Sequence, residues 1–147
     1  MSDEGKRGKY VELFSAISGS DNRGEDEKTM NKQKLESYCL RLPGSVHDYQ
    51  TEWEADRYQV GGKIFAMIGC DPAGKSIITL KCDPHRSEEL RETYHGVIPG
   101  YYMNKSHWIS IYFDSDIPEE LVANLISHSY EMVFQKLPKK LQKQIKP

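Results

Sequence analysis

The residues best suited to bind a ligand or a partner occur in the stretch PGYYMNKSHW, which begins with a proline-glycine turn. Tyrosine, histidine and tryptophan rings stack on nucleobases or fill pockets on a partner protein. Asn104 offers amide donors and an acceptor, and Lys105 offers a positive charge that a phosphate group could use. Trp108 has an alternative role, because it begins the run WISIYF and could pack in the core beside Tyr101 or Tyr102.

Basic residues elsewhere in the chain could extend this surface. Lysine and arginine would contact phosphates, the tyrosines would stack, and Asn104 would contact a base edge. The lysine-rich tail FQKLPKKLQKQIK is typical of a solvated helix end, where cations are favourable, although it could also contact phosphates. The expected nucleic-acid-binding residues are Lys63, Lys81, Arg86, Tyr101, Tyr102, Asn104, Lys105 and His107.

The sequence lacks the spacings that are typical of metal sites, phosphate loops and catalytic sites. Its histidines are scattered, and VGGKIF lacks the first glycine and the final Ser or Thr of a phosphate loop. Cys82 could pair with His85 or His107 as thiolate and imidazole, but a cysteine that ends an apolar strand is typically a small buried hydrophobe. We therefore expect no enzyme activity, no metal and no cofactor.

The composition predicts one soluble domain. The chain has 147 residues, of which 37% are hydrophobic and 29% are charged. No apolar run approaches the ~20 residues of a membrane helix, and the first thirty residues lack the apolar centre of a secretory signal. We therefore expect a cytoplasmic protein without membrane contact, whose three cysteines are reduced and mostly buried.

The overall charge is close to neutral. The net charge is −2, and residues 29–147 carry fifteen basic and fifteen acidic side chains. This balance is no footprint of a nucleic-acid-binding protein, so any basic surface must be local. Taken alone, it favours a protein partner over DNA.

The chain is expected to consist of an N-terminal extension, residues 1–28, and a single domain, residues 29–147. The extension contains SGSDNRGEDEK, which has no periodic apolar residue and predicts a disordered or loosely docked segment. Before it, KYVELFSAI could form a short helix.

Four strands are predicted in the domain. The segment DRYQVGGKIFAMIG predicts two strands joined at Gly61 and Gly62, and IITLKC predicts a third. These connections are too short for parallel crossovers, so we expect an antiparallel meander. WISIYF predicts the fourth strand, whereas residues 46–56 are mixed and acidic and are expected to be irregular.

Three helices are predicted around these strands. The first spans residues 31–42, the second begins after an Asp83 N-cap and ends at Gly96, and the third begins with a capping box of Asp116 and Glu119. The order helix, three strands, helix, strand, helix predicts an α+β domain in which helices cover one face of a small, mostly antiparallel sheet.

Several motifs together resemble a known family. They are LPGS, VGGKIFAMIG, LKCDPHRSEELRETYHGVIPGYYMNKSHWISI and ISHSYEMVFQKLPKKLQ, in this order. From Leu35 to Leu141 the chain resembles the MmcQ/YjbR family of small bacterial proteins. The resemblance implies a fold like the double-wing DNA-binding domain of a phage transcription factor, and it implies DNA binding. The acidic DYQTEWEAD and residues 1–28 depart from the family pattern.

We therefore expect a small, monomeric, non-enzymatic DNA-binding protein that contacts phosphates through a local basic and aromatic surface. The alternative is a protein-interaction or small-ligand module that uses the same aromatic face.

Overall fold

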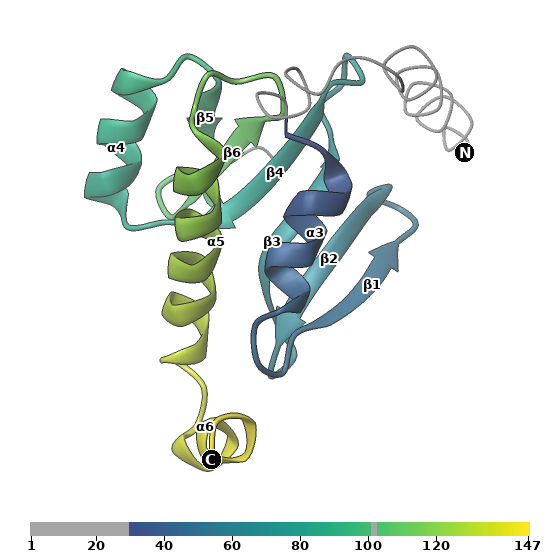
Figure 1. Ribbon diagram of the computed structural model, residues 1–147, viewed down its shortest axis with the longest axis vertical. Coiled ribbons are helices and arrows are strands. Elements are labelled where there is room, and N and C mark those ends of the chain that lie inside the picture. Colours follow the sequence, from purple (N-terminus) through teal and green to yellow (C-terminus); the bar gives the residue numbers. More distant parts are fainter. Residues whose placement is uncertain (1–29, 101–102) are drawn as a thin grey trace.

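The computed structural model describes residues 30–100 and 103–147, so the predicted extension and its short helix lie outside the described residues. The strands form one antiparallel sheet in the order β1-β2-β3-β4-β6-β5 (Figure 1). The strands are β1 (Val46–Gln50), β2 (Ala55–Val60), β3 (Lys63–Cys70), β4 (Ser76–Lys81), β5 (Val97–Pro99) and β6 (Trp108–Tyr112). The helices are α3 (Lys32–Leu40), α4 (Pro84–Thr93), α5 (Glu119–Phe134) and α6 (Lys139–Ile145).

The α+β prediction is confirmed, with α3, α4 and α5 on the same face of the sheet (Figure 1). The predicted hairpin is also confirmed, because Gly61 and Gly62 both have positive φ angles, of 59° and 81°. Asp83 is the N-cap of α4, and its carboxylate accepts the N–H groups of His85 and Arg86.

Three local predictions were wrong. Part of the segment expected to be irregular forms β1, which pairs with β2 in regular register. The helix α4 ends at Thr93 and not at Gly96. Gly96 instead allows its backbone to lie close to Ser115, because a Cβ at Gly96 would lie 2.3 Å from the Cβ of Ser115. The helix α5 has no capping box: its N-cap is Pro118, and the Glu119 carboxylate accepts a hydrogen bond from the Tyr38 hydroxyl at 2.6 Å.

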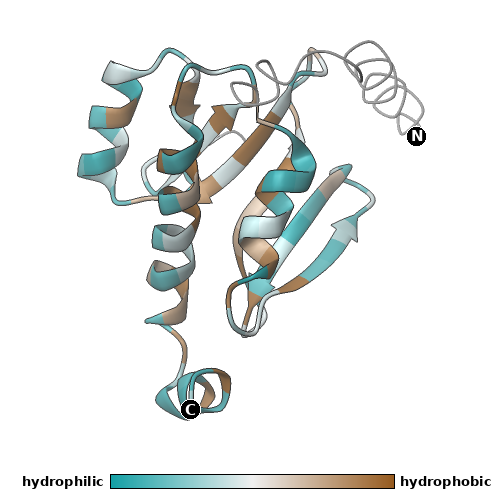
Figure 2. Cartoon of the chain, viewed as in Figure 1, coloured by the Kyte–Doolittle hydropathy of each residue, from teal (hydrophilic) through white to brown (hydrophobic). Residues whose placement is uncertain are grey.

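The core lies between the sheet and α5. The apolar side of α5 packs on β3 and β4, and the Tyr130 ring meets the Phe65 ring edge to face at 5.3 Å between centroids. Figure 2 shows hydrophobic residues concentrated on the central strands, whereas the outer side of α3 is hydrophilic. The apolar side of α5 thus faces the sheet and the hydrophilic side of α3 faces outward, as expected for amphipathic helices.

Ser129 joins α5 to the two central strands at the point where their pairing ends. The β3–β4 register runs from the Cys70–Ser76 pair to the Ala66–Leu80 pair. One step further, the buried Ser129 hydroxyl donates to the Phe65 carbonyl at 2.5 Å and accepts the Lys81 N–H at 2.9 Å. A single side chain thus satisfies two backbone groups where the ladder stops.

The helix α6 and Leu137, which precedes it, pack against two backbone turns through apolar side chains. At Gly61, a Cβ would lie 2.7 Å from a methyl group of Leu137 and 3.2 Å from one of Leu141. At Gly44, a Cβ would lie 2.9 Å from a methyl group of Ile145. The absence of side chains at these turns lets α6 lie directly on the end of the sheet.

We predict that Ser129→Ala lowers the free energy of unfolding by about 2–4 kcal/mol, because a buried unsatisfied backbone group costs about 1–3 kcal/mol and two would be created. Urea denaturation followed by circular dichroism measures the change. Ser127→Ala is the matched control, since Ser127 is exposed on the same helix, and it should change stability by less than about 0.5 kcal/mol. Equal effects of the two variants would contradict the role of Ser129.

We predict that Gly61→Ala destabilises the protein more than Gly62→Ala does. Both residues have positive φ, so each alanine adopts a left-handed conformation that costs roughly 1–2 kcal/mol. Only Gly61 faces Leu137, while no atom lies within 4 Å of a Cβ at Gly62. Overpacking at Gly61 should therefore add about 1–3 kcal/mol, measured by urea denaturation. Equal losses in the two variants would mean that α6 does not pack closely on the turn.

Candidate nucleic-acid interface

Segments that are far apart in the sequence meet at one end of the sheet. The β2–β3 turn lies there, since Lys63 is paired with Val60. The end of β4 lies beside the start of β6, because Lys81 is opposite Trp108 and the Cys82 N–H donates to the His107 carbonyl at 2.8 Å. The helix α4 begins just after this point, and α6 packs on the β2–β3 turn (Figure 1).

This end of the sheet carries a set of basic residues that we call the basic end. The basic end consists of Lys63, Lys81, Arg86, Lys105, Lys136, Lys139, Lys140 and Lys143. Lys81 and Arg86 are half-buried, and the others are exposed. Lys105 is exposed but contacts its own loop. Within the described parts of the chain, no carboxylate forms an ion pair with Lys63, Lys81, Arg86, Lys136, Lys139, Lys140 or Lys143.

The opposite end of the sheet is acidic, and its cations form ion pairs. Lys75 lies 3.5 Å from Asp114, and Lys32 lies 2.8 Å from Asp56. The carboxylates of this end are Glu52, Glu54, Asp71, Asp114, Asp116, Glu119 and Glu120. The two ends therefore differ in charge, but the basic end is not free of carboxylates, because Asp83 lies beside Arg86 and Glu131 pairs with Lys146 near it.

The loop that precedes β6 presents its polar side chains to solvent. Asn104, Lys105, Ser106 and His107 are all exposed. The Asn104 side-chain oxygen accepts the Ser106 N–H at 2.9 Å, and its backbone carbonyl accepts the His107 N–H at 3.1 Å. Asn104 thus forms the turn, and its side-chain oxygen keeps one further acceptor position, since an amide oxygen accepts two hydrogen bonds.

Lys105 and Lys81 are each held by their surroundings. The Lys105 ammonium donates to the Gly100 carbonyl at 3.3 Å. The Lys81 ammonium lies 5.9 Å from the centroid of the Trp108 ring, which is a cation–π contact. Burial, and then repulsion from Lys136, lower the pKa of Lys81.

Most of the binding residues predicted from the sequence lie at this one end of the sheet: Lys63, Lys81, Arg86, Asn104, Lys105 and His107. Tyr101 and Tyr102 lie outside the described residues. Trp108 is only 8% exposed, which agrees with its alternative role in packing.

Sequence reasoning gave little weight to four lysines of the basic end. The tail sequence is typical of a solvated helix end, but Lys136 follows α5 and the other three lie on α6, which packs on the β2–β3 turn beside the predicted residues. The signal that could have identified them is the tail itself, since Gln135–Pro147 contains five lysines and no acidic residue.

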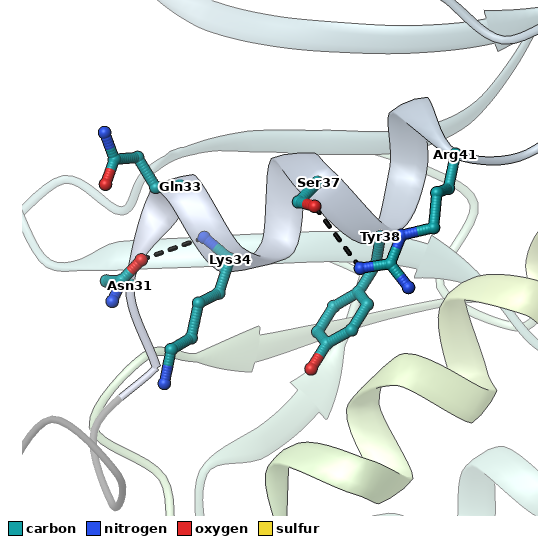
Figure 3. Close-up of a pocket in the computed structure, with 6 residues that line it drawn as sticks. All are labelled: Asn31, Gln33, Lys34, Ser37, Tyr38 and Arg41. Carbon is teal, nitrogen blue, oxygen red and sulfur yellow. Dashed lines mark hydrogen bonds between the residues drawn. The ribbon is translucent and has the colours of Figure 1, made fainter.

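A pocket on the outer surface of α3 offers a different kind of site (Figure 3). Its polar groups largely bind one another or their neighbours. The Asn31 side chain caps the helix by accepting the Lys34 N–H at 2.9 Å, and the Tyr38 hydroxyl donates to Glu119. This hydrogen bond, and then burial, raise the pKa of Tyr38. The pocket therefore offers no activated nucleophile or base.

The thiol chemistry considered from the sequence finds no support in the geometry. Cys82 is 1% exposed, and burial raises the pKa of its thiol. Burial likewise raises the pKa of Cys39 to about 12. The imidazole of His85 points to Glu89, at 3.9 Å, and is exposed. These thiols behave as small buried hydrophobes rather than as nucleophiles.

The described residues lack two kinds of feature. No cluster of three or more potential metal ligands is present among them. None of the described helices has the length and hydropathy that crossing a bilayer requires.

Comparison with known proteins assigns the chain to a family. The family model YjbR matches residues 40–132. "Uncharacterized protein YbdF" of Escherichia coli is 38% identical over 122 residues, which cover 80% of this chain and 99% of the relative. "Uncharacterized protein YjbR" of Escherichia coli is 29% identical over 114 residues, which cover 78% of this chain and 96% of the relative.

Solved structures share the fold. The crystal structure of Deinococcus radiodurans protein DR2400, described as a DUF419 domain, has a TM-score of 0.71 and 30% identity and covers 80% of this chain and 89% of its own. A Pseudomonas syringae crystal structure, at 24% identity, has a TM-score of 0.62, covers 70% of this chain and 98% of its own, and supports the fold alone. The expected family is thereby confirmed: the chain belongs to the YjbR family.

Proposed function

We propose that this protein binds DNA through the basic end and that it has no enzymatic activity of its own. The observation that carries the proposal is the gathering of basic side chains at one end of the sheet, in a domain whose charges balance overall. All of them except Lys105 form no ion pair with a carboxylate of the described residues. A phosphate backbone is the ligand that best matches several mobile lysines at once. The resemblance to a double-wing DNA-binding domain belongs to the same proposal.

The acidic end does not cancel this attraction at physiological salt. The central strand β3 has eight residues, which span about 26 Å. The Debye length at this ionic strength is about 8 Å. A phosphate at the basic end therefore interacts mainly with the lysines near it, and the distant carboxylates act to orient the approaching protein.

The geometry favours contacts to phosphates over contacts to bases. Lys63, Lys139 and Lys140 are exposed and flexible, which suits phosphate binding. Asn104 is fixed in the turn by its hydrogen bond to the Ser106 N–H, and Trp108 is buried. We therefore propose binding with weak sequence preference. The alternative of an aromatic interaction face receives less support, since its tryptophan is not accessible.

We predict that duplex binding falls steeply with salt. With about five phosphate contacts, log affinity should fall against log salt with a slope near −4.5. In the double variant Lys139→Gln with Lys140→Gln, the loss of two contacts should reduce the slope to about −2.7. Fluorescence anisotropy of a labelled duplex, titrated between about 50 and 200 mM salt, measures both slopes.

The matched control is Lys75→Gln, which removes the same charge from an exposed lysine at the acidic end. It should leave the slope and the affinity of the wild type unchanged. If Lys75→Gln weakens binding as the Lys139 and Lys140 changes do, the attraction is not local to the basic end. Failure to bind duplex or single strands at low salt with tens of micromolar protein would end the proposal.

A further inference from the structure

Of the four large hydrophobic side chains that are exposed in the described residues, three lie on the outer strand β1 or in the turn that follows it. They are Val46 (60% exposed), Tyr49 (49%) and Trp53 (45%), whereas the fourth, Leu40 (45%), lies on a helix and outside this edge. Leu40 ends α3, Val46 and Tyr49 belong to β1, and Trp53 lies in the turn that follows. Val46 and Tyr49 lie on opposite faces of β1, so exposed apolar side chains flank this edge on both sides, which suits an edge that another chain covers.

The two edges of the sheet differ in how they are protected. The β5 edge has only three residues, ends at Pro99, and has α4 packed against it. The β1 edge has five residues in regular register with β2, without proline, lysine or a bulge. Within the described residues, no strand pairs with its outer side. Proteins that stay monomeric often protect such an edge with proline, lysine or a bulge, and the one carboxylate on β1, that of Asp48, is paired with Arg57.

We propose that β1 pairs with β1 of a second copy of this chain, antiparallel and about a two-fold axis. Two identical strands related by a two-fold axis normal to the sheet are necessarily antiparallel, and each copy offers the same surface. The joined sheet would then have β1 and its copy at its centre. This inference does not rest on the proposed function, and it replaces the monomer expected from the sequence.

The side chains of β1 favour an axis at Tyr49. Rotation about such an axis leaves every side chain on its original face of the sheet. Residues directly opposite each other on antiparallel strands share a face, so the axis must pass between two copies of the same residue. An axis at Asp48 would place two carboxylates opposite each other, which is unfavourable. An axis at Tyr49 instead places the two tyrosine rings together and Asp48 opposite Gln50 of the second copy. Arg57 donates two hydrogen bonds to the Asp48 carboxylate, at 2.8 and 2.6 Å, and the side-chain amide of Gln50 from the second copy can donate to the same carboxylate.

The surroundings of β1 fit a protein strand better than a nucleic acid. The adjacent turn exposes Glu52 and Glu54, which repel phosphates. The main contacts of β1 are with β2, so the helices leave its outer side accessible (Figure 1). A second copy brings main-chain donors and acceptors, which are what an open edge lacks.

Sedimentation of the full chain tests the proposal. The wild type, a chain of 16.9 kDa, should sediment at twice that mass as concentration rises from micromolar to sub-millimolar. Tyr49→Lys should weaken dimerisation by at least tenfold while its circular dichroism spectrum stays native. The matched control is Leu40→Lys, because Leu40 is about as exposed but lies on a helix, and it should dimerise like the wild type. A wild type that stays monomeric throughout this range, or a Tyr49→Lys variant that dimerises fully, overturns the proposal.

Cross-linking tests the position of the axis. In a Cys70→Ser background, the remaining native thiols, Cys39 and Cys82, are buried. Tyr49→Cys in this background should form an intermolecular disulfide under mild oxidation, because opposite residues of antiparallel strands lie within disulfide reach. Leu40→Cys in the same background is the control and should remain largely uncross-linked. Equal cross-linking of both variants would place the contact elsewhere and overturn the Tyr49 axis.

Discussion

The placement of α5 on the central strands is the constraint on which the rest of the structure depends. Its buried Ser129 hydroxyl donates to the carbonyl of Phe65 and accepts the N–H of Lys81, where the β3–β4 ladder ends. A helix seated only by apolar contacts could slide with little penalty, but a shift here would leave two backbone groups unsatisfied. The same contact fixes where α5 ends, and therefore where Lys136 and α6 lie relative to the sheet.

This constraint explains how a nearly neutral domain can present a basic surface. The cations come from a hairpin turn, the end of a strand, the start of a helix and a C-terminal helix. None of these segments is strongly basic except the last. Antiparallel pairing brings them to one end, and the acidic turns and the start of α5 are brought to the other. Net charge describes composition, whereas attraction to a phosphate depends on this arrangement.

The sequence predicted those features whose causes are local. Gly61 with Gly62 specifies a turn by itself, and Asp83 specifies a helix start. By contrast, β1 was missed because an edge strand exposed on both faces shows no apolar alternation. The capping box failed because Tyr38, 81 positions away in sequence, binds Glu119 instead. For the candidate site, residue types were predictable, but their meeting depends on strand register and on α6 packing, which no spacing in the sequence encodes.

The two proposed surfaces have a joint geometric consequence. A two-fold axis normal to the sheet at Tyr49 reverses the strand direction in the second copy, so the two basic ends would point in opposite directions along the strands. One short straight duplex could not contact both ends at once. A dimer of this kind would instead hold two separate duplex segments, or two distant parts of one, and its avidity would depend on the flexibility between them. Self-association through β1 would therefore determine which duplex segments one dimer can hold together. It would not change the contacts that each basic end makes with its own segment.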